Sequence, residues 1–337
     1  MSQNIEAPSR FDELSALFDD ANTLETPKIV DCKLSGGTET QCFSITTGPA
    51  PANHKTGPYC PRTISDTAEQ AGTWFVNEKL YDVDGKFIEQ LGVIYNDNEW
   101  QMFDAATGKV TLAEGQLGCD VAGDPNSAPD YKNYCVECEV KYLDPNAGQT
   151  FVFPLEPVLT TGNPSRIGPH TGIGLAFNGV KLDAPAPLDL ILGSHTLGLF
   201  DACVGHVNPT TGYHYHGLVG CEPNKTAGAA NHSPLVAVAM DGFDIYAKLD
   251  DGEAGSLDEC GGHVVGGLGY HYHVEAAGTN QFIGCFKAES GCTLDNSSAT
   301  CDASVQERRG PRGRGPEGAG PGGPRPDGPR PDGPRPD

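Results

Sequence analysis

The sequence predicts a mainly β protein in which duplicated β-hairpin units pack about a pseudo-two-fold axis, are held by disulfides and follow a small β-rich region. Three observations predict this fold class. The pentapeptide GYHYH occurs at 212–216 and again at 269–273. Short alternating apolar runs are separated by turns rich in the 44 Gly and 27 Pro residues. The 12 cysteines are even in number and spread from Cys32 to Cys301, as in a disulfide framework.

A chain of 337 residues can hold two to three ordinary domains. Composition and motifs divide it into five segments. These are an N-terminal segment with a short helix (1–27), a cysteine-containing β-rich region (28–160), a duplicated domain (165–290, with units at 167–221 and 231–285), a cysteine-containing segment (291–302) and a disordered Pro/Arg/Gly/Asp tail (303–337).

The N-terminal half shows one helix and one disulfide-bridged hairpin. Ser9 and Asp12 precede a short apolar-periodic run, which predicts a capped helix. The stretch KIVDCKLSGGTETQCFSI predicts a hairpin across Ser-Gly-Gly, with Cys32 and Cys42 placed to bridge its strands. The stretch YDVDGKFIEQLGVIY predicts a second hairpin at its Asp-Gly dipeptide, because its acidic residues lack the spacing of a calcium-binding loop.

Two further features of this half have alternative interpretations. Cys135 and Cys138 form a lone CxxC, which fits a redox pair or half of a zinc site. Without a second CxxC or a βαβ pattern around it, structural disulfides are favoured. His54 is expected at the surface or in a turn.

The tail ends in three copies of GPRPD. Glycine does not recur at every third position, which excludes collagen, so the tail is expected to be extended and without a core. It is a candidate tether to an acidic polymer or the extracellular matrix.

The two GYHYH stretches are the ends of longer repeats. Each follows the same pattern, C-x2-H-x7-H-x-H, which begins at Cys203 and again at Cys260. Further upstream, Asn-Gly at 178–179 and Asp-Gly at 241–242 each lie between alternating apolar residues, which predicts a hairpin in each unit. His170 and His232 precede these hairpins, with a spacing that differs by one residue.

Side-chain alternation in a strand predicts two metal sites. Residues i and i+2 share a face, so His214 and His216 converge while Tyr213 and Tyr215 point the other way. His206 supplies a third imidazole, and three imidazoles suit Cu or Zn with a position left for water or substrate. The predicted ligands are His206, His214, His216, His263, His271 and His273, with His170 and His232 as weaker candidates. The alternative is that these histidines only hydrogen-bond loops.

In each unit the C-x2-H spacing is typical of a zinc site, but a further cysteine ends each unit, at Cys221 and Cys285. We therefore expect the disulfides Cys203–Cys221 and Cys260–Cys285, with Cys292 and Cys301 paired locally. Asp241 stands opposite Asn178 and is a ligand, a proton acceptor or, as favoured here, a turn residue. His195 has no counterpart in the other unit and is expected to be structural.

The net charge of −23 opposes binding to nucleic acid or to anionic membranes. No apolar run approaches the roughly 18 residues of a membrane span, and no signal peptide is visible. Two locations stay open: outside the cytoplasm with the cysteines in disulfides, or cytosolic with free or metal-bound thiols. The cysteines and the Gly/Pro turns favour the extracellular or periplasmic location.

The segments GHVNPTTGYHYHGLVGC, HSPLVAVAMDGFDIYA and LDECGGHVVGGLGYHYH resemble the YHYH family of exported bacterial and algal proteins over roughly 165–290. The segment IVDCKLSGGTETQC…GPYCPRTISDTAE resembles the N-terminal region of one subset of that family. The resemblance implies the domain and export, and it supplies no catalytic residues.

These observations predict an exported protein whose histidine sites bind Cu or Zn, with a metalloenzyme of unidentified substrate left open. The alternative is a non-catalytic module for extracellular metal capture or surface structure. No nucleophile motif, phosphate loop or carboxylate pair identifies a substrate.

Overall fold

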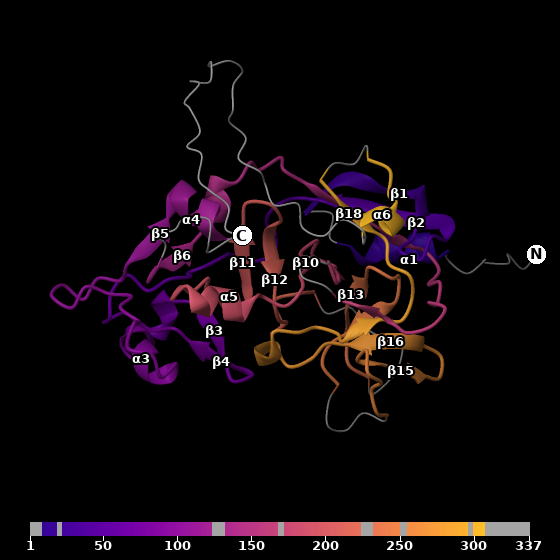
Figure 1. The fold of residues 1–337 in the computed structure, drawn as a ribbon. Coiled ribbons are helices and arrows are strands. Elements are labelled where there is room, and N and C mark those ends of the chain that lie inside the picture. Colours follow the sequence, from indigo (N-terminus) through magenta and orange to yellow (C-terminus); the bar gives the residue numbers. More distant parts are fainter. Residues whose placement is uncertain are drawn as a thin grey trace, which may run out of the picture.

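The computed structural model describes residues 9–18, 22–122, 132–167, 172–223, 232–249, 255–295 and 299–306, and the fold is mainly β. Figure 1 shows a sheet near the N-terminus, a central sheet and a smaller lobe containing α2–α4. The helices are α1 Arg10–Leu17, α2 Gly85–Glu89, α3 Leu91–Ile94, α4 Gly115–Ala122, α5 Leu188–Gly193 and α6 Ala303–Gln306, with the 3-10 helices η2 Ala68–Gln70, η3 Val140–Tyr142 and η4 Ala277–Thr279. The strands are β1 Thr23–Lys33, β2 Glu39–Thr47, β3 Thr73–Val76, β4 Lys79–Asp82, β5 Leu112–Glu114, β6 Cys135–Glu137, β7 Gln149–Pro154, β8 Ser165–Arg166, β9 Gly174–Ala176, β10 Lys181–Leu182, β11 Gly205–Asn208, β12 Gly212–Tyr215, β13 Leu235–Ala239, β14 Asp244–Tyr246, β15 Gly262–Val265, β16 Gly269–His273, β17 Cys285–Phe286 and β18 Cys292–Leu294.

The N-terminal sheet has the order β1-β2-β7-β18. The predicted hairpin is confirmed, since β1 and β2 pair antiparallel and Cys32 bonds to Cys42. Strand β1 begins at Thr23, inside the segment assigned to 1–27. Strand β18 pairs with β7, so the segment 291–302 belongs to this sheet. The predicted capping box is present at α1, where Ser9 and Asp12 hydrogen-bond reciprocally.

The central sheet has eight strands in the order β11-β12-β10-β9-β13-β14-β16-β15. The two halves use equivalent strands in mirrored positions and meet at the antiparallel pair β9–β13. In each half the YHYH strand runs parallel to the second strand of the preceding hairpin, β12 with β10 and β16 with β14. The strand order merges both units into one sheet, and the two-fold relation between the units stays a prediction.

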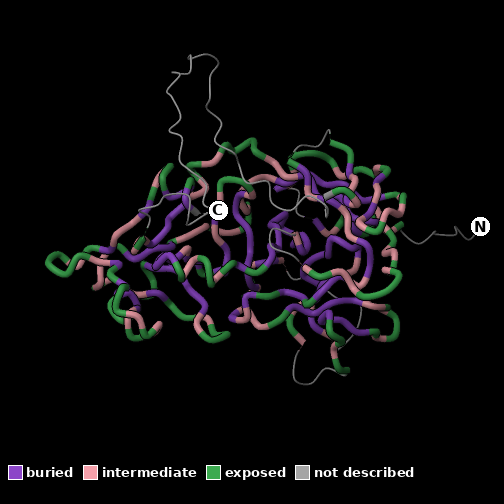
Figure 2. The backbone as a smooth tube through the Cα atoms, in the orientation of Figure 1, coloured by how far each residue is buried: buried purple, intermediate pink, exposed green. Residues whose placement is uncertain are grey.

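A shared core joins the two sheets. Phe18, the residue after α1, connects them: its ring centroid lies 5.7 Å from that of Phe43 in β2 and 5.3 Å from that of Phe177, which follows β9. Phe43 and Phe177 are fully buried. The central strands are accordingly buried along most of their length in Figure 2, and the exposed segments lie at the periphery.

The hairpin predicted at Asp84-Gly85 is wrong. Asp84 is instead the N-cap of α2, and its side chain accepts a hydrogen bond from Phe87 N at 2.9 Å. Phe87, Ile88 and Leu91 are buried with the spacing of one helical face. The hairpin of this lobe lies earlier, between β3 and β4.

All twelve cysteines form disulfides. The predicted pairs Cys32–Cys42, Cys203–Cys221, Cys260–Cys285 and Cys292–Cys301 are confirmed. The CxxC residues bond to different partners, in Cys60–Cys135 and Cys119–Cys138, so the expected structural role is confirmed and a redox pair is excluded.

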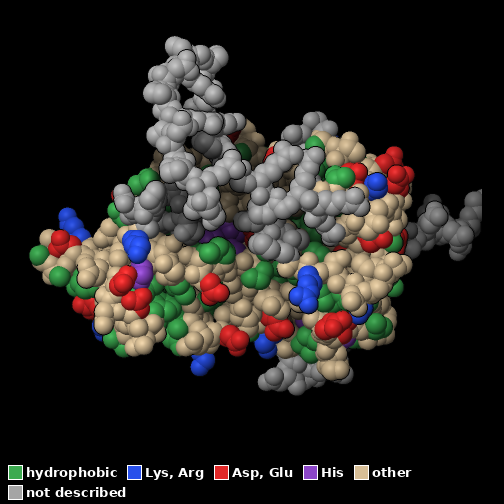
Figure 3. All heavy atoms as spheres, in the orientation of Figure 1, with side chains coloured by type: hydrophobic (Ala, Val, Ile, Leu, Met, Phe, Trp, Pro, Cys, Tyr) green, Lys and Arg blue, Asp and Glu red, His purple; other side chains and the backbone are tan. Residues whose placement is uncertain are grey.

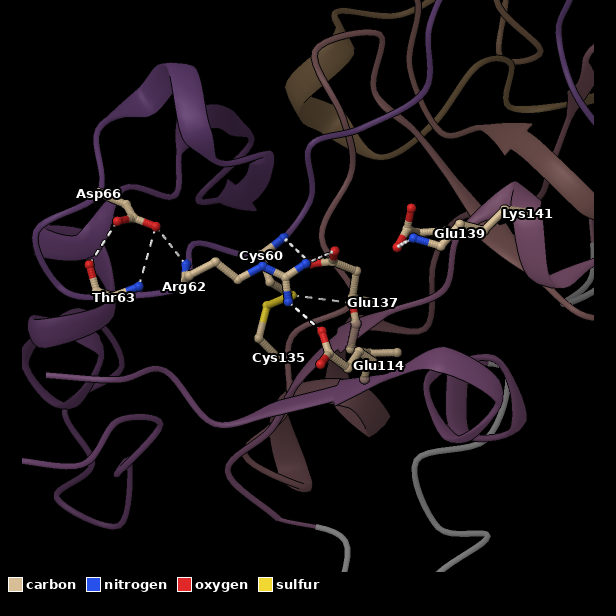
Figure 4. A network of polar contacts seen from close by, with 10 residues as sticks. Cys60, Arg62, Thr63, Asp66, Glu114, Cys135, Glu137, Glu139 and Lys141 are labelled. Carbon is tan, nitrogen blue, oxygen red and sulfur yellow. Dashed lines mark hydrogen bonds and ion pairs between the residues drawn. A yellow bond between two sulfur atoms is a disulfide. The ribbon is translucent and has the colours of Figure 1, made fainter. Parts of the chain in front are cut away.

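A buried carboxylate beside the Cys60–Cys135 disulfide organises the lobe (Figure 4). Glu137 has a side-chain exposure of 7% and accepts hydrogen bonds from Arg62 and from Cys60 N. The Arg62 guanidinium also bonds Glu114 and thereby connects β5 to β6. Burial raises the pKa of Glu137, and the nearby Arg62 charge opposes that rise.

Arg62→Met is expected to lower the free energy of unfolding by about 1–3 kcal/mol, because Glu137 would stay buried without its cation. Lys141→Met is the matched control, since Lys141 and its partner Glu139 are more exposed (61% and 31%) and surface pairs contribute about 0–1 kcal/mol. Urea unfolding measures both variants. Equal losses of unfolding free energy in the two variants would contradict the role assigned to the Arg62–Glu137 pair.

Within the described residues, no helix combines the length and the apolar character needed to cross a membrane. Helix α6 and the buried Ala303 lie inside the segment 303–337 that was predicted to be disordered, so this part of the prediction is wrong. Ala303 packs near the Cys292–Cys301 disulfide in a small apolar cluster, which orders the chain there. Residues 307–337, including the GPRPD copies, lie outside the described residues.

Candidate metal centres

The histidines of each unit are brought together by a β-hairpin. In the first unit β11 pairs with β12, and His206 stands directly opposite His214. In the second unit β15 pairs with β16, and His263 stands directly opposite His271. His216 and His273 follow two residues later and share the same face. The predicted convergence of three imidazoles is therefore present in both units.

We call His206, His214 and His216 the first cluster, and His232, His263, His271 and His273 the second cluster. Within each cluster, one nitrogen per imidazole lies within 4.8 Å of the corresponding nitrogens of the others. The ring spacings of the two clusters nearly match. The centroid distances are 4.7, 4.9 and 5.0 Å in the first cluster and 4.7, 4.9 and 5.2 Å for the equivalent pairs of the second.

In the second cluster, three pairs of Nε2 atoms lie 3.0 Å apart. This distance separates His232 from His271, His271 from His263, and His263 from His273. Nitrogen ligands about 2.0–2.1 Å from a shared ion lie roughly 2.8–3.4 Å apart for bond angles of 90–110°. The spacing therefore matches that of imidazoles around one metal.

Backbone carbonyls determine which ring nitrogen carries the proton. His271 Nδ1 donates to Gly269 O at 3.1 Å, His273 Nδ1 to Ala247 O at 2.8 Å and His232 Nδ1 to Ser233 O at 3.0 Å. A carbonyl oxygen only accepts, and a neutral imidazole has one proton, so each Nε2 carries a lone pair. With their protons on Nδ1, His232 and His271 cannot hydrogen-bond each other through Nε2, and their spacing suits a shared cation.

The first cluster is held in the same way. His206 Nδ1 donates to Gly198 O at 3.1 Å, and His214 Nδ1 donates to Gly212 O at 3.0 Å. His216 differs, because both of its ring nitrogens are buried without a hydrogen-bond partner among the described residues. The backbone of Ala184 acts to raise the pKa of His216, but the two groups do not meet hydrogen-bond geometry. In the second unit the equivalent residue, Ala247, accepts a hydrogen bond from His273. Two unpaired buried nitrogens are costly unless a ligand or an ion binds them.

The tyrosines face away from the histidines, as predicted, and anchor each hairpin from behind. The hydroxyl of Tyr213 donates to Asp201, and the hydroxyl of Tyr270 donates to the equivalent Asp258. Both aspartates also accept from backbone amides of the turn that carries the third histidine. The tyrosines thus determine the position of the histidine strands without contributing to the clusters.

The second tyrosine of each stretch bonds the turn of the preceding hairpin. Tyr215 accepts from Asn178 Nδ2 at 2.9 Å, and Tyr272 donates to Asp241 at 2.6 Å. Asp241 is fully buried on this face, which places it outside the second cluster and agrees with the favoured turn role. Burial raises the pKa of Asp241 to about 6.

Two glycines of each repeat have a steric role. The glycine that opens GYHYH has a φ of +70° at Gly212 and +71° at Gly269, a region that favours glycine. The glycine before the third histidine lies against a tyrosine, since a Cβ at Gly205 or Gly262 would fall 2.3 Å from the hydroxyl of Tyr213 or Tyr270. The invariant spacing of the two repeats therefore reflects packing as well as ligand geometry.

The two clusters differ in their surroundings. Beside the first cluster, Asp183 lies 3.9 Å from His214 Nε2 and forms a buried ion pair with Lys181 at 3.0 Å. Beside the second, Tyr246 occupies the equivalent place, with ring centroids 4.6 Å from His232 and from His271. In Figure 3 histidine shows only as small areas on the visible face, as expected for largely buried clusters.

Burial keeps these imidazoles neutral. It lowers the pKa of His206 to about 3 and that of His271 to about 4. The pKa values of His214 and His216 are lowered by the same cause. Neutral imidazole is the form that binds metals, so these residues are in the ligating state at neutral pH.

Acid is expected to destabilise the metal-free protein below pH 6.5. The unfolded histidines take up protons near that pH, while in the folded state His206 and His271 stay neutral down to about pH 3 and 4. The unfolded state therefore binds more protons in this window, and stability falls as the pH falls, by roughly 1.4 kcal/mol per pH unit for each such histidine. Urea unfolding from pH 8 to 4 measures the slope. Constant stability across that range would contradict it.

One comparison with known proteins gave a match. Residues 150–256 match the family model described as YHYH protein. The chain therefore contains a YHYH domain, which supports the resemblance seen in the sequence. The match contains the first cluster and ends before His263, so the remaining histidines of the second YHYH unit are identified by the internal repeat. Searches of curated proteins and of solved structures each gave no match.

The structure locates the other histidines of interest. His232, a weaker candidate in the sequence, joins the second cluster, whereas His170 lies outside the described residues. His195 is buried and bonds Asp97 at 2.7 Å in the lobe, away from both clusters. His54 is half-buried on the tyrosine face, where its Nε2 lies 3.3 Å from the hydroxyl of Tyr213. Only the one-residue offset between His170 and His232 distinguished these two residues in the sequence.

Proposed function

We propose that this YHYH protein is an exported metal-binding protein that holds one Cu or Zn ion in each histidine cluster. The observation that carries the proposal is the convergence of four imidazoles: three pairs of their Nε2 atoms lie 3.0 Å apart, while Nδ1 of His232, His271 and His273 bonds backbone carbonyls. Hydrogen bonds that fix the tautomer of metal-ligating histidines are the usual outer shell of such sites. Imidazole suits both zinc and copper.

Export is part of the proposal. Six disulfides that use every cysteine are typical of proteins outside the reducing cytosol. A net charge of −23 suits a protein that meets cations and is kept away from nucleic acid.

The two clusters support different roles for the metal. Three imidazoles among the described residues leave a position for water or substrate in the first cluster, the arrangement found in catalytic zinc sites. Four imidazoles fill a tetrahedral site in the second cluster, the arrangement of closed sites. We therefore assign any chemistry on a substrate to the first cluster, and tight retention of metal to the second.

Metal analysis of the natively purified, tag-free protein tests the proposal. We expect two equivalents of Cu or Zn per chain, and the loss of one equivalent in His214→Ala/His216→Ala and of the other in His271→Ala/His273→Ala. Each double variant removes two ligands from one cluster and leaves the other intact. Unchanged stoichiometry in folded double variants would refute the site assignment and favour the alternative, a structural module with hydrogen-bonded histidines.

A further inference from the structure

A cavity of about 500 Å³ lies where the N-terminal sheet, α4 and the β11–β12 turn of the first unit meet. None of the cluster histidines lines it. Its volume falls in the range of small-molecule binding sites, about 300–1,000 Å³. The wall residues that matter here are Gln116, Tyr142, Gln149, Lys181 and Thr211.

Two buried polar groups at this wall have unused hydrogen-bonding capacity. Gln149 Oε1 is buried and has no hydrogen-bond partner among the described residues, although its Nε2 donates to Thr210 O at 3.4 Å. Lys181 is 5% exposed, and its ammonium, which has three donors, pairs with Asp183. A ligand that donates to the amide oxygen and accepts from the ammonium would use both.

The charges of the wall select the class of ligand. Asp144 and Asp295 also line the cavity, and the charge of Lys181 is already offset by Asp183, so the wall as a whole repels an anion. Asp144 and Asp295 would favour a cation, and a cationic probe is therefore part of the test. The remaining polar side chains are hydroxyls and amides, which both donate and accept. Tyr142 is 36% exposed, with the Lys141 ammonium 5.0 Å from the centroid of its ring, so one face of the ring is left for a ligand.

We propose that this cavity binds a neutral polyhydroxylated ligand, a carbohydrate unit, whose hydroxyls engage Gln149 and Lys181 and whose ring packs on Tyr142. The site also contacts the first cluster. Thr211 Oγ1 lies 3.3 Å from His214 Nδ1, and the Lys181–Asp183 pair reaches within 3.9 Å of His214 Nε2. Binding in the cavity itself does not depend on the proposed metal.

Titration calorimetry of the full chain, freed of metal, tests the cavity with cellobiose, maltose, laminaribiose and N,N′-diacetylchitobiose at millimolar concentration. Sodium sulfate and choline chloride serve as charged probes. We expect at least one disaccharide to bind, and Gln149→Met and Tyr142→Ala each to weaken it by roughly tenfold, the factor for about 1.4 kcal/mol. Tyr81→Ala is the matched control, since Tyr81 is similarly exposed (43%) and does not line the cavity.

Three results would overturn the proposal: no binding of any of the four disaccharides, binding of sulfate or choline in their place, or equal affinity in the wild type and both cavity variants. The absence of metal from these titrations separates this outcome from that of the metal assignment. If the chain binds a disaccharide and no metal, the cavity assignment holds and the proposed metal-binding function is refuted. If it binds metal and no disaccharide, the metal-binding function holds and the cavity assignment is refuted.

Discussion

His232→Ala is expected to weaken metal binding at the second cluster by at least roughly 100-fold and to leave the first cluster unchanged. His232 Nε2 lies 3.0 Å from His271 Nε2, so the substitution removes one of four ligands from a closed set. Changes in the outer shell alone cost about 10–100-fold in affinity, and losing a ligand costs more. Competition with a chelator of known affinity, after loading with Zn, measures the two sites separately.

The matched control is His54→Ala, which removes a half-buried histidine from the tyrosine face and none from either cluster. It should bind two metals with the affinity of the wild type. If His232→Ala retained the wild-type affinity at both sites, His232 would be a neighbour of the second site and not a ligand. Spectra of Co(II)-loaded protein give a second readout, because removing the fourth imidazole opens a position that azide can occupy.

Asp201→Ala is expected to lower the free energy of unfolding by about 3–5 kcal/mol. Asp201 is 1% exposed and accepts hydrogen bonds from the hydroxyl of Tyr213 and from the backbone amides of Gly57, Cys203 and Gly205. Its removal would leave several buried donors without partners, and each such donor costs about 1–3 kcal/mol. The same turn positions His206, so metal binding at the first cluster should weaken as well.

The repeat provides the control for this prediction. Asp258 makes the equivalent bonds to Tyr270 and to two backbone amides, but it is exposed, so water can replace the lost carboxylate. Asp258→Ala is therefore expected to cost about 1 kcal/mol. Urea unfolding of both variants measures the difference. Similar losses of stability in Asp201→Ala and Asp258→Ala would show that burial does not determine how much this aspartate contributes to the free energy of unfolding.

Much of the candidate site could be predicted because its signals are local. Strand alternation placed His214 and His216 on one face with the tyrosines behind, and the repeated C-x2-H interval identified His206 and His263. Four disulfides followed from cysteines that lie 9 to 25 residues apart. These features depend on residues that are close in sequence, and for such residues the sequence spacing largely fixes their relative positions in space.

The Asp84-Gly85 segment shows why a local signal can also mislead. Asp-Gly is a strong hairpin signal, but the same aspartate can cap a helix, and the dipeptide alone does not distinguish the two. Burial of Phe87, Ile88 and Leu91 against the lobe decides for the helix, which makes this an effect of tertiary packing. His232 is a similar case, since its position in the sequence gave no indication that it would join the second cluster.

The sequence by itself determined the duplicated hairpins, the six predicted ligand positions and the opposite orientation of the tyrosines, because these follow from the period of a strand and from the repeated C-x2-H-x7-H-x-H spacing. Only the tertiary structure decided how the units join. The β9–β13 pairing, the entry of β18 into the N-terminal sheet and the recruitment of His232 depend on contacts between distant segments. The free energy of such contacts comes from burial and hydrogen bonding in three dimensions, which sequence spacing does not encode. The same contacts bury Asp201 and leave Asp258 exposed, so two units with the same motif acquire different environments.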